Sequence, residues 1–398
     1  MSRRTATGRA AVRIYLDHAA TTPLASPARE AMLPWLGGVA ANPSSVHRSG
    51  QRARAAVETA RERVAFALGA RPAEIVFTSG ATEADALGVH GTLAALPGEA
   101  ALVVSAAEHA AVLEAARAEE AAGRPVVRVA PGPEGAPSPE ALDAALAEHA
   151  GPVGLVAVMH TNNETGALAD VAALAKVAHR HGALMLCDAV QAFGAAPLDV
   201  TSLGADLLTV SSHKVGGPQG AGALWVRDGL ALVPQQRGGA QERGRRAGTH
   251  AVAALVGFGV AAEAVSRDVA DRASALATRR DRLEAALADQ PGIHRNGAGP
   301  RGPKHLNVRV EGVDGEALLM ALDDAGVEVS AGSACAAGSL EPSHVLIAMG
   351  LPKEQAKASL RFSVAPATTE EEIDAAAERT IAAVARLRAL PVGALGPL

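Results

Sequence analysis

The hydrophobic positions between about residues 25 and 264 fall into short runs that are separated by Ala-rich helical stretches. Each run is apolar throughout rather than alternating with polar residues, which is typical of strands buried on both faces. Strands that alternate with helices predict an α/β fold with a mostly parallel sheet. The predicted strands are 74–79, 101–105, 125–130, 151–160, 183–189, 206–212 and 222–226. The last two runs lie close together in the chain, so we expect one antiparallel pair in this sheet.

The pattern changes after a long charged helix that is predicted near residues 265–290. A Gly/Pro-rich link, NGAGPRGPKH, leads into shorter strands and helices, and the final helix begins with a capping box at Thr369 and Glu372. This half of the chain predicts a second, smaller α+β domain. We expect an N-terminal arm (1–24) that joins the small domain, a large domain (25–264) and the small domain (265–398).

Composition narrows the class of protein. Hydrophobic residues make up 48% of the 398 residues and aromatic residues only 2%, so the interior is built from Ala, Val and Leu. A formal net charge of −5 offers no basic surface for nucleic acid. No apolar run is long enough to span a bilayer. Two cysteines form no disulfide framework, and we expect a cytoplasmic protein without nucleic-acid or membrane partners.

Polar residues stand where several predicted strands end. Lys214 follows one strand in VSSHK and precedes a Gly-rich turn, Asp188 ends another with Gln191 three residues later, and Ala81 and Thr82 open a helix after a third. The carboxyl ends of parallel strands meet at one edge of a sheet, where ligands bind in α/β proteins. Taken singly, these residues also fit a surface lysine, a helix cap and an ordinary helix start.

Together the same residues predict a cofactor. A lysine can form a covalent bond to an aldehyde, an acid can pair with a pyridine nitrogen, and small residues at a helix N-terminus can hold a phosphate. Pyridoxal 5'-phosphate requires all three. Asn163 in HTNNETG and His109 in SAAEH end two further strands. No spacing of His, Cys or acidic residues indicates a metal site.

The chain resembles the cysteine desulfurases of the NifS/IscS type, which are class V aminotransferase-like enzymes of pyridoxal phosphate fold type I. The resemblance runs nearly from end to end, and no one of its motifs would be specific alone. The motifs are YLDHAATTPL, NPSSVHRSG, FTSGATEAD, AEH, HTNNETG, CDAVQ, SSHK, ERGRRAGT, GSACAAGSLEPSHVLIAMG and SLRFS. It departs from many relatives in the second serine of SSHK and in Ala41 before Asn42.

The resemblance implies a role for each matched residue. Lys214 is expected to bind the cofactor covalently, and Asp188 to pair with its ring nitrogen. His109 is expected to stack on the ring and to take part in catalysis together with Lys214 and Cys335. The phosphate is expected to contact the Ala81–Thr82 helix start and further polar side chains, one of them from a second subunit. Those further residues are Ser211, His213 and Thr249, while Gln191 and Asn163 are expected near the phenolic oxygen. Asn42 and Arg361 are expected to bind the substrate carboxylate.

Cys335 is expected to be the sulfur acceptor. It stands among small residues in SAGSACAAGS, whereas Cys187 lies in a buried-type strand and is expected to be inert. The resemblance implies conversion of L-cysteine to L-alanine with a persulfide on Cys335, in a homodimer. The sulfur would pass to an acceptor protein for iron–sulfur cluster assembly or tRNA thiolation. The alternatives are a selenocysteine lyase, a class V aminotransferase, or a non-catalytic scaffold for sulfur-transfer partners.

Overall fold

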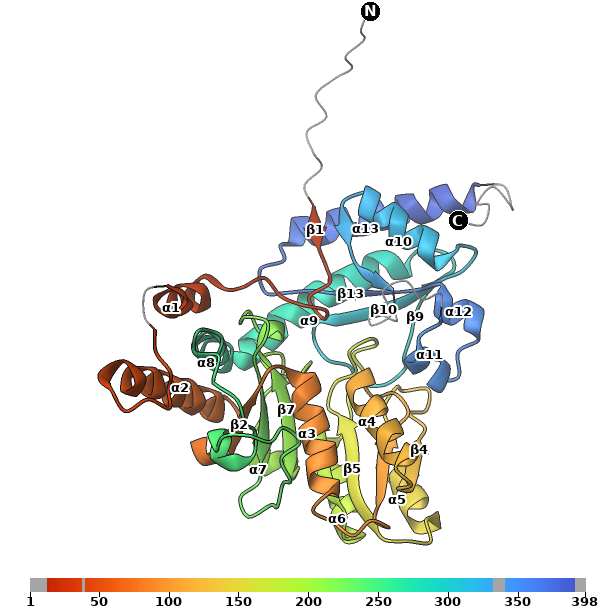
Figure 1. Ribbon diagram of the computed structural model, residues 1–398. Coiled ribbons are helices and arrows are strands. Elements are labelled where there is room, and N and C mark those ends of the chain that lie inside the picture. The colour runs from red at the N-terminus through yellow and green to blue at the C-terminus, as the bar shows by residue number, and fades with distance from the viewer. Residues whose placement is uncertain (1–12, 38–39, 332–340, 391–398) are drawn as a thin grey trace, which may run out of the picture.

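The computed structural model describes residues 13–37, 40–331 and 341–390 (Figure 1). Cys335, the predicted sulfur acceptor, lies outside the described residues. The described helices pack around two main sheets, one of seven strands and one of four. Figure 1 shows the seven-stranded sheet in the lower half of the molecule and the four-stranded sheet above it.

The larger sheet contains all seven strands that the hydrophobic runs predict. Its spatial order is β2-β8-β7-β6-β5-β3-β4. The strands are β2 (Ile75–Thr78), β3 (Ala101–Ser105), β4 (Val126–Val129), β5 (Val153–Met159), β6 (Leu184–Asp188), β7 (Leu207–Ser211) and β8 (Gly222–Val226). Every residue of β3 and β5 to β8 is buried except Leu184, as expected for strands covered on both faces.

The predicted antiparallel pairing of the last two strands is confirmed, and the sheet contains a second antiparallel pair that was not predicted. Strand β8 pairs in antiparallel fashion with β7 and also with β2. The ten-residue turn after β7 returns the chain beside that strand, and β8 is thereby inserted between β7 and β2. The insertion brings Gly222 against the backbone of Gly80, where an added Cβ would lie only 2.6 Å from the Gly80 carbonyl carbon.

Helices cover both faces of this sheet. Figure 1 shows α3 crossing in front of the strands, and α8 packs against α1 and α2 at one side. The helices of this half are α1 (Ser26–Leu36), α2 (Arg48–Ala67), α3 (Ala81–Leu93), α4 (Ala110–Ala121), α5 (Pro139–Glu148), α6 (Val171–Arg180), α7 (Val200–Leu203) and α8 (Val252–Ser266). Three short 3₁₀ turns, at Pro72–Glu74, Ser212–Lys214 and Gln241–Gly244, connect these elements.

The second half has its own core around an antiparallel sheet of order β12-β13-β10-β9. Its strands are β9 (Ile293–Arg295), β10 (His305–Val310), β11 (Val327–Glu328), β12 (Ser330–Ala331) and β13 (Ser359–Ser363), of which β11 pairs with β1 instead. Its helices are α9 (Val269–Ala288), α10 (Gly315–Asp324), α11 (His344–Ala348), α12 (Lys353–Lys357) and α13 (Glu370–Arg388). The limits of the domains at residues 24 and 264 stay predictions.

The chain before α1 connects the two halves. Strand β1 (Ile14–Tyr15) pairs in parallel with β11, and Ile14 and Leu16 are buried in the core of the second half. Residues 17–22, called the strap below, then cross to the larger sheet. His18 N–H donates to Ser363 O at one end of the strap, and Thr22 N–H donates to His213 O at the other. The strap therefore connects the end of β13 in the smaller sheet to the turn that follows β7 in the larger sheet.

No helix in the described part of the chain is long and apolar enough to cross a membrane.

The predicted capping box of the last helix is confirmed, and its contribution can be measured. Thr369 Oγ1 accepts a hydrogen bond from Glu372 N–H, and the Glu372 carboxylate accepts one from Thr369 N–H. We expect Thr369→Ala to lower the free energy of unfolding by about 1 kcal/mol, because the first helical turn loses a partner for its N–H group. Thr369→Ser keeps the hydroxyl, and its urea unfolding midpoint should stay near that of the wild type.

Candidate active site

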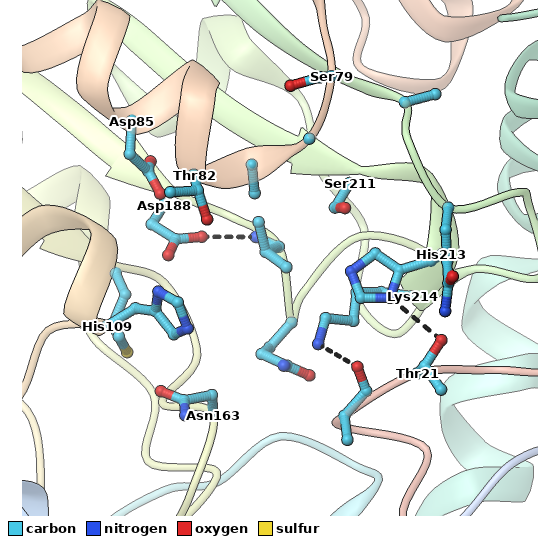
Figure 2. A pocket seen from close by; sticks show the side chains of 18 of the residues that line it. Thr21, Ser79, Thr82, Asp85, His109, Asn163, Asp188, Ser211, His213 and Lys214 are labelled. Carbon is cyan, nitrogen blue, oxygen red and sulfur yellow. Dashed lines mark hydrogen bonds between the residues drawn. The ribbon is translucent and has the colours of Figure 1, made fainter. Parts of the chain in front are cut away.

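A cavity of about 390 Å³ lies where the larger sheet meets the strap. It is lined by nine of the residues that the sequence predicts for a cofactor site, and they come from five separate segments of the chain. These residues are Ala81, Thr82, His109, Asn163, Asp188, Gln191, Ser211, His213 and Lys214. Figure 2 shows Asp188 and His109 on one side of this cavity and His213 and Lys214 on the other.

Lys214 ends the short 3₁₀ turn that follows β7, and its amine contacts the strap. The Nζ atom donates hydrogen bonds to Ala19 O at 2.6 Å and to Ala20 O at 2.7 Å. The neighbouring side chain of His213 forms a hydrogen bond with Thr21 Oγ1 at 3.1 Å (Figure 2). Burial and the nearby Lys214 lower the pKa of His213 to about 4, so the imidazole is neutral at pH 7.

Asp188 ends β6 and is 8% exposed. Its Oδ1 accepts a hydrogen bond from Val190 N–H at 2.9 Å. Burial raises the pKa of Asp188, while the neighbouring His109, the hydrogen bond from Val190 N–H and the charge of Lys214 act in the opposite direction. A cationic group placed in the cavity would therefore stabilise the carboxylate.

Two further acids are buried beside Asp188. Asp85 lies on α3 one turn after Thr82 and lines the cavity, and Glu108 directly precedes His109. Burial raises the pKa of both carboxyl groups well above the usual range, and the charge of Asp188 adds to the effect. Asp85 could not be selected from the sequence, since an acid in the second turn of a helix is ordinarily exposed.

His109 is the N-cap of α4. Its Nδ1 accepts a hydrogen bond from Ala111 N–H at 3.1 Å. Burial lowers the pKa of His109, so its ring is neutral and carries its proton on Nε2. The backbone contact fixes this ring at the wall of the cavity.

The N-terminus of α3 and a buried hydroxyl form a pocket for an anion. Gly80 is the N-cap of this 13-residue helix, and Ala81 and Thr82 are its first two residues. All three line the cavity, so the unpaired N–H groups of the first helical turn are available there. Ser211 Oγ is buried and has no hydrogen-bond partner among the described residues. An oxygen-rich group at this position would provide a partner for the hydroxyl, so the residues fit a phosphate.

Three of the predicted residues lie outside the cavity of the single chain. Thr249 is exposed, and Asn42 is exposed with its Oδ1 accepting from Ser44 N–H. Arg361 is 1% exposed on β13 and donates to Asp17 Oδ1 at 2.6 Å and to Asn163 O at 2.9 Å. Arg361 therefore reaches the cavity wall through Asn163.

Arg246 in the motif ERGRRAGT contacts the start of α3 through Glu83. Arg246 Nε donates to Glu83 Oε1 at 2.7 Å, and Glu83 also accepts from Ser79 N–H beside the helix start. Arg246 thus braces the predicted phosphate site from outside, a role that no spacing in the sequence indicates.

The described residues include one of the two cysteines, Cys187. Cys187 is fully buried in β6, and burial raises the pKa of its thiol well above the usual range. A thiolate is the reactive form, so Cys187 is inert. No group of three or more metal-ligating side chains occurs among the residues with described positions.

The fold and this cavity define a fold type I pyridoxal phosphate enzyme. The family model for aminotransferase class-V matches residues 14–376. A cysteine desulfurase of Enterobacter agglomerans is 43% identical over 380 residues, which cover 95% of this chain and 94% of the relative. The chain therefore belongs to the aminotransferase class-V family, whose cysteine desulfurase members depend on pyridoxal phosphate.

Solved structures agree with this assignment. A NifS-like protein of Rickettsia africae ESF-5 has a TM-score of 0.85 at 30% identity, with 93% of this chain and 99% of that chain covered. The protein SspA, solved in complex with cysteine, has a TM-score of 0.77 at 33% identity, with 89% of this chain and 100% of that chain covered.

The basic surroundings of Lys304 make stability depend on pH. Lys304 is 5% exposed, and burial together with the charges of Lys214, Arg272 and Arg361 lowers its pKa to about 7. Between pH 7 and 10 the unfolded chain binds a proton here that the folded chain does not, so Lys304 destabilises the fold less as pH rises.

We expect Lys304→Met to remove this dependence. The free energy of unfolding of the cofactor-free wild type, measured relative to the variant, should rise with pH by up to about 1.4 kcal/mol per unit between pH 7 and 10. The exposed Lys353→Met variant should follow the wild type. A constant difference between wild type and Lys304→Met would show that Lys304 keeps its ordinary pKa.

Proposed function

We propose that this protein is a pyridoxal phosphate-dependent cysteine desulfurase that converts L-cysteine to L-alanine and transfers the sulfur to Cys335. The observation that carries the proposal is the cavity that joins the Lys214 amine, the Asp188 carboxyl group and the N-terminus of α3. Those three groups match the aldehyde, the ring nitrogen and the phosphate of the cofactor. The cysteine desulfurase relatives, which align over nearly the whole chain, support the choice of substrate.

The cofactor site takes its residues from both sides of the cavity. Ala81 and Thr82 would hold the phosphate through the helix N-terminus, with the hydroxyl of Ser211 and the ring of His213 beside it. Asp188 would pair with the ring nitrogen, and His109 would stack on the ring. Asn163 and Gln191 would lie near the phenolic oxygen. When bound, pyridoxal phosphate supplies an aldehyde and a ring that accepts electrons.

Lys214 would act both as the covalent attachment point and as the general base. Ala19 O and Ala20 O orient its amine within the cavity. As a free amine, Lys214 would be placed to take the proton from the substrate Cα. The strap thus positions the group that moves the proton.

Arg361 and Asn42 would bind the substrate carboxylate. In the structure Arg361 is bonded to Asp17, and both the guanidinium group and its partners are fixed by β13 and the strap. A planar guanidinium group binds carboxylates through paired hydrogen bonds, which suits it to an amino-acid substrate.

The sulfur transfer requires no oxidant. The Cys335 thiolate would attack the substrate sulfur, so that a sulfur–sulfur bond forms while the bond between that sulfur and the substrate Cβ breaks. The electron pair of the broken bond stays with the carbon fragment, which takes up the proton lost by the Cys335 thiol and leaves as alanine. Cys335 then carries a persulfide.

The persulfide would pass to an acceptor protein in the cytoplasm, either an iron–sulfur scaffold or a tRNA-thiolation protein. A selenocysteine lyase would use the same cavity, and an aminotransferase would not need Cys335. A non-catalytic scaffold would not need to retain Lys214, Asp188 and Arg361 together. The presence of all three favours catalysis.

Product analysis tests the reaction. Incubation of the purified protein with pyridoxal phosphate and L-cysteine should give alanine and a persulfide on Cys335 in equal amounts, measured by amino-acid analysis and mass spectrometry. Lys214→Ala should give neither product and lose the yellow colour of the bound cofactor. Cys335→Ser should bind the cofactor but form no persulfide on the protein.

The alternatives give other products in the same assay. Transamination would yield neither alanine nor persulfide from cysteine, and a scaffold would leave cysteine unchanged. Sulfide release by Cys335→Ser at the wild-type rate would remove Cys335 from the reaction.

We also propose that the enzyme is a homodimer with shared sites, in which Thr249 reaches the phosphate of the partner subunit. Thr249 is exposed and lies away from the cavity of its own chain. Exposed apolar side chains on and after α1 provide a surface for a second copy: Leu33 is 57% exposed, Leu36 65% and Val46 84%.

Complementation between two inactive variants tests the shared site. Thr249→Ala and Lys214→Ala should each be nearly inactive as homodimers. Mixed dimers should regain activity, because one site then contains an intact Lys214 and receives Thr249 from the other subunit. Sedimentation should show a dimer, whereas a fully active monomer or the lack of complementation would contradict the proposal.

A further inference from the structure

His305 lies outside the cavity but is linked to Lys214 by a chain of hydrogen bonds. It is the first residue of β10 and is 0% exposed. Its Nε2 lies 3.2 Å from Gln191 Oε1, and Gln191 Nε2 donates to Ala19 O at 3.0 Å. Ala19 O also accepts from Lys214 Nζ at 2.6 Å. His305, Gln191 and Lys214 are therefore connected through the strap.

The carbonyl oxygen of Ala19 determines which group is the donor and which the acceptor in each of these hydrogen bonds. A carbonyl oxygen only accepts hydrogen bonds, so the group of Gln191 that faces it must be the NH₂. The oxygen of Gln191 then faces His305, and His305 Nε2 must carry the proton that it donates. The reversed amide would place two acceptors against each other at Ala19.

Two glycines pack against the other side of His305. A Cβ added at Gly166 would lie 2.7 Å from His305 Cβ and 3.4 Å from His305 Nδ1, and one added at Gly302 would lie 3.8 Å from His305 Nδ1. Gly166 also has a φ of 78°, which favours glycine. Nδ1 is buried and has no hydrogen-bond partner among the described residues.

Nearby cations keep His305 neutral. Burial lowers its pKa well below the ordinary value, and Lys304, Arg361, Lys214 and Arg280 act in the same direction. The ring therefore carries one proton rather than two, and the bond to Gln191 places that proton on Nε2.

We propose that His305 is a positioning residue, which fixes the side-chain amide of Gln191 so that one N–H of this amide serves the cofactor. Gln191 lines the cavity, and its NH₂ has a second hydrogen that the contact with Ala19 does not use. Without His305, only the hydrogen bond to Ala19 O opposes rotation of the amide, so the orientation in which its oxygen faces the anionic oxygen of the cofactor becomes more populated. This inference rests on the proposed function, in which Gln191 lies near the phenolic oxygen.

A double-mutant cycle separates positioning from general support of the fold. The readout is the dissociation constant of pyridoxal phosphate from the cofactor-free protein, measured by the change in absorbance on binding. We expect His305→Leu to raise this constant about threefold to tenfold, the range for one hydrogen bond, and His305→Gln to restore binding because it keeps an N–H donor. In a Gln191→Ala background, His305→Leu should change the constant by less than about twofold.

Two results would overturn the inference. One is a His305→Leu protein that binds the cofactor as well as the wild type does, and the other is an equal loss with and without Gln191. His305→Met, which also lacks the donor, takes the place of His305→Leu if the latter does not fold. If the wild type itself binds no pyridoxal phosphate or forms no alanine from cysteine, the proposed function fails instead.

Discussion

The contact between the strap and Lys214 is the constraint on which the rest of the site depends. Two backbone carbonyl groups of residues near the N-terminus hold an amine that follows β7, and the same strap bonds to Ser363 of the second sheet. Backbone groups have no rotamers, so the position of the amine follows from how the two sheets sit relative to each other. Arg361 is fixed by the same arrangement, because its partner Asp17 belongs to the strap.

Charge is arranged unevenly around this contact. Asp85 and Asp188 line the cavity and Glu108 is buried nearby, and burial raises the pKa of all three carboxyl groups. His213 lines the opposite side, and Lys304 and His305 are buried outside the cavity; burial lowers the pKa of these three groups. A ligand with a basic ring nitrogen beside Asp188, such as pyridoxal phosphate, would stabilise the carboxylate form of this acid.

The sequence predicts much of this structure because the local signals are strong. All seven strands of the larger sheet follow from continuous apolar runs, and the nine predicted residues that line the cavity stand at or shortly after strand ends or at helix starts. The second antiparallel pairing of β8 could not be predicted, since strand order depends on packing between distant segments. In the sequence, Lys304 and His305 are the last residues of a Gly/Pro-rich link. No local sequence pattern predicts that tertiary contacts bury them near Lys214.

The strap also sets the order in which the enzyme can be completed. Ala19 N–H donates to Ser363 Oγ, a contact that spans 344 positions of the chain. The segment that orients the reactive lysine is thus made long before Ser363, to which it bonds. A chain that lacks β13 has lost the contacts of the strap with Ser363, so orientation of the amine for capture of the cofactor waits for late, long-range contacts.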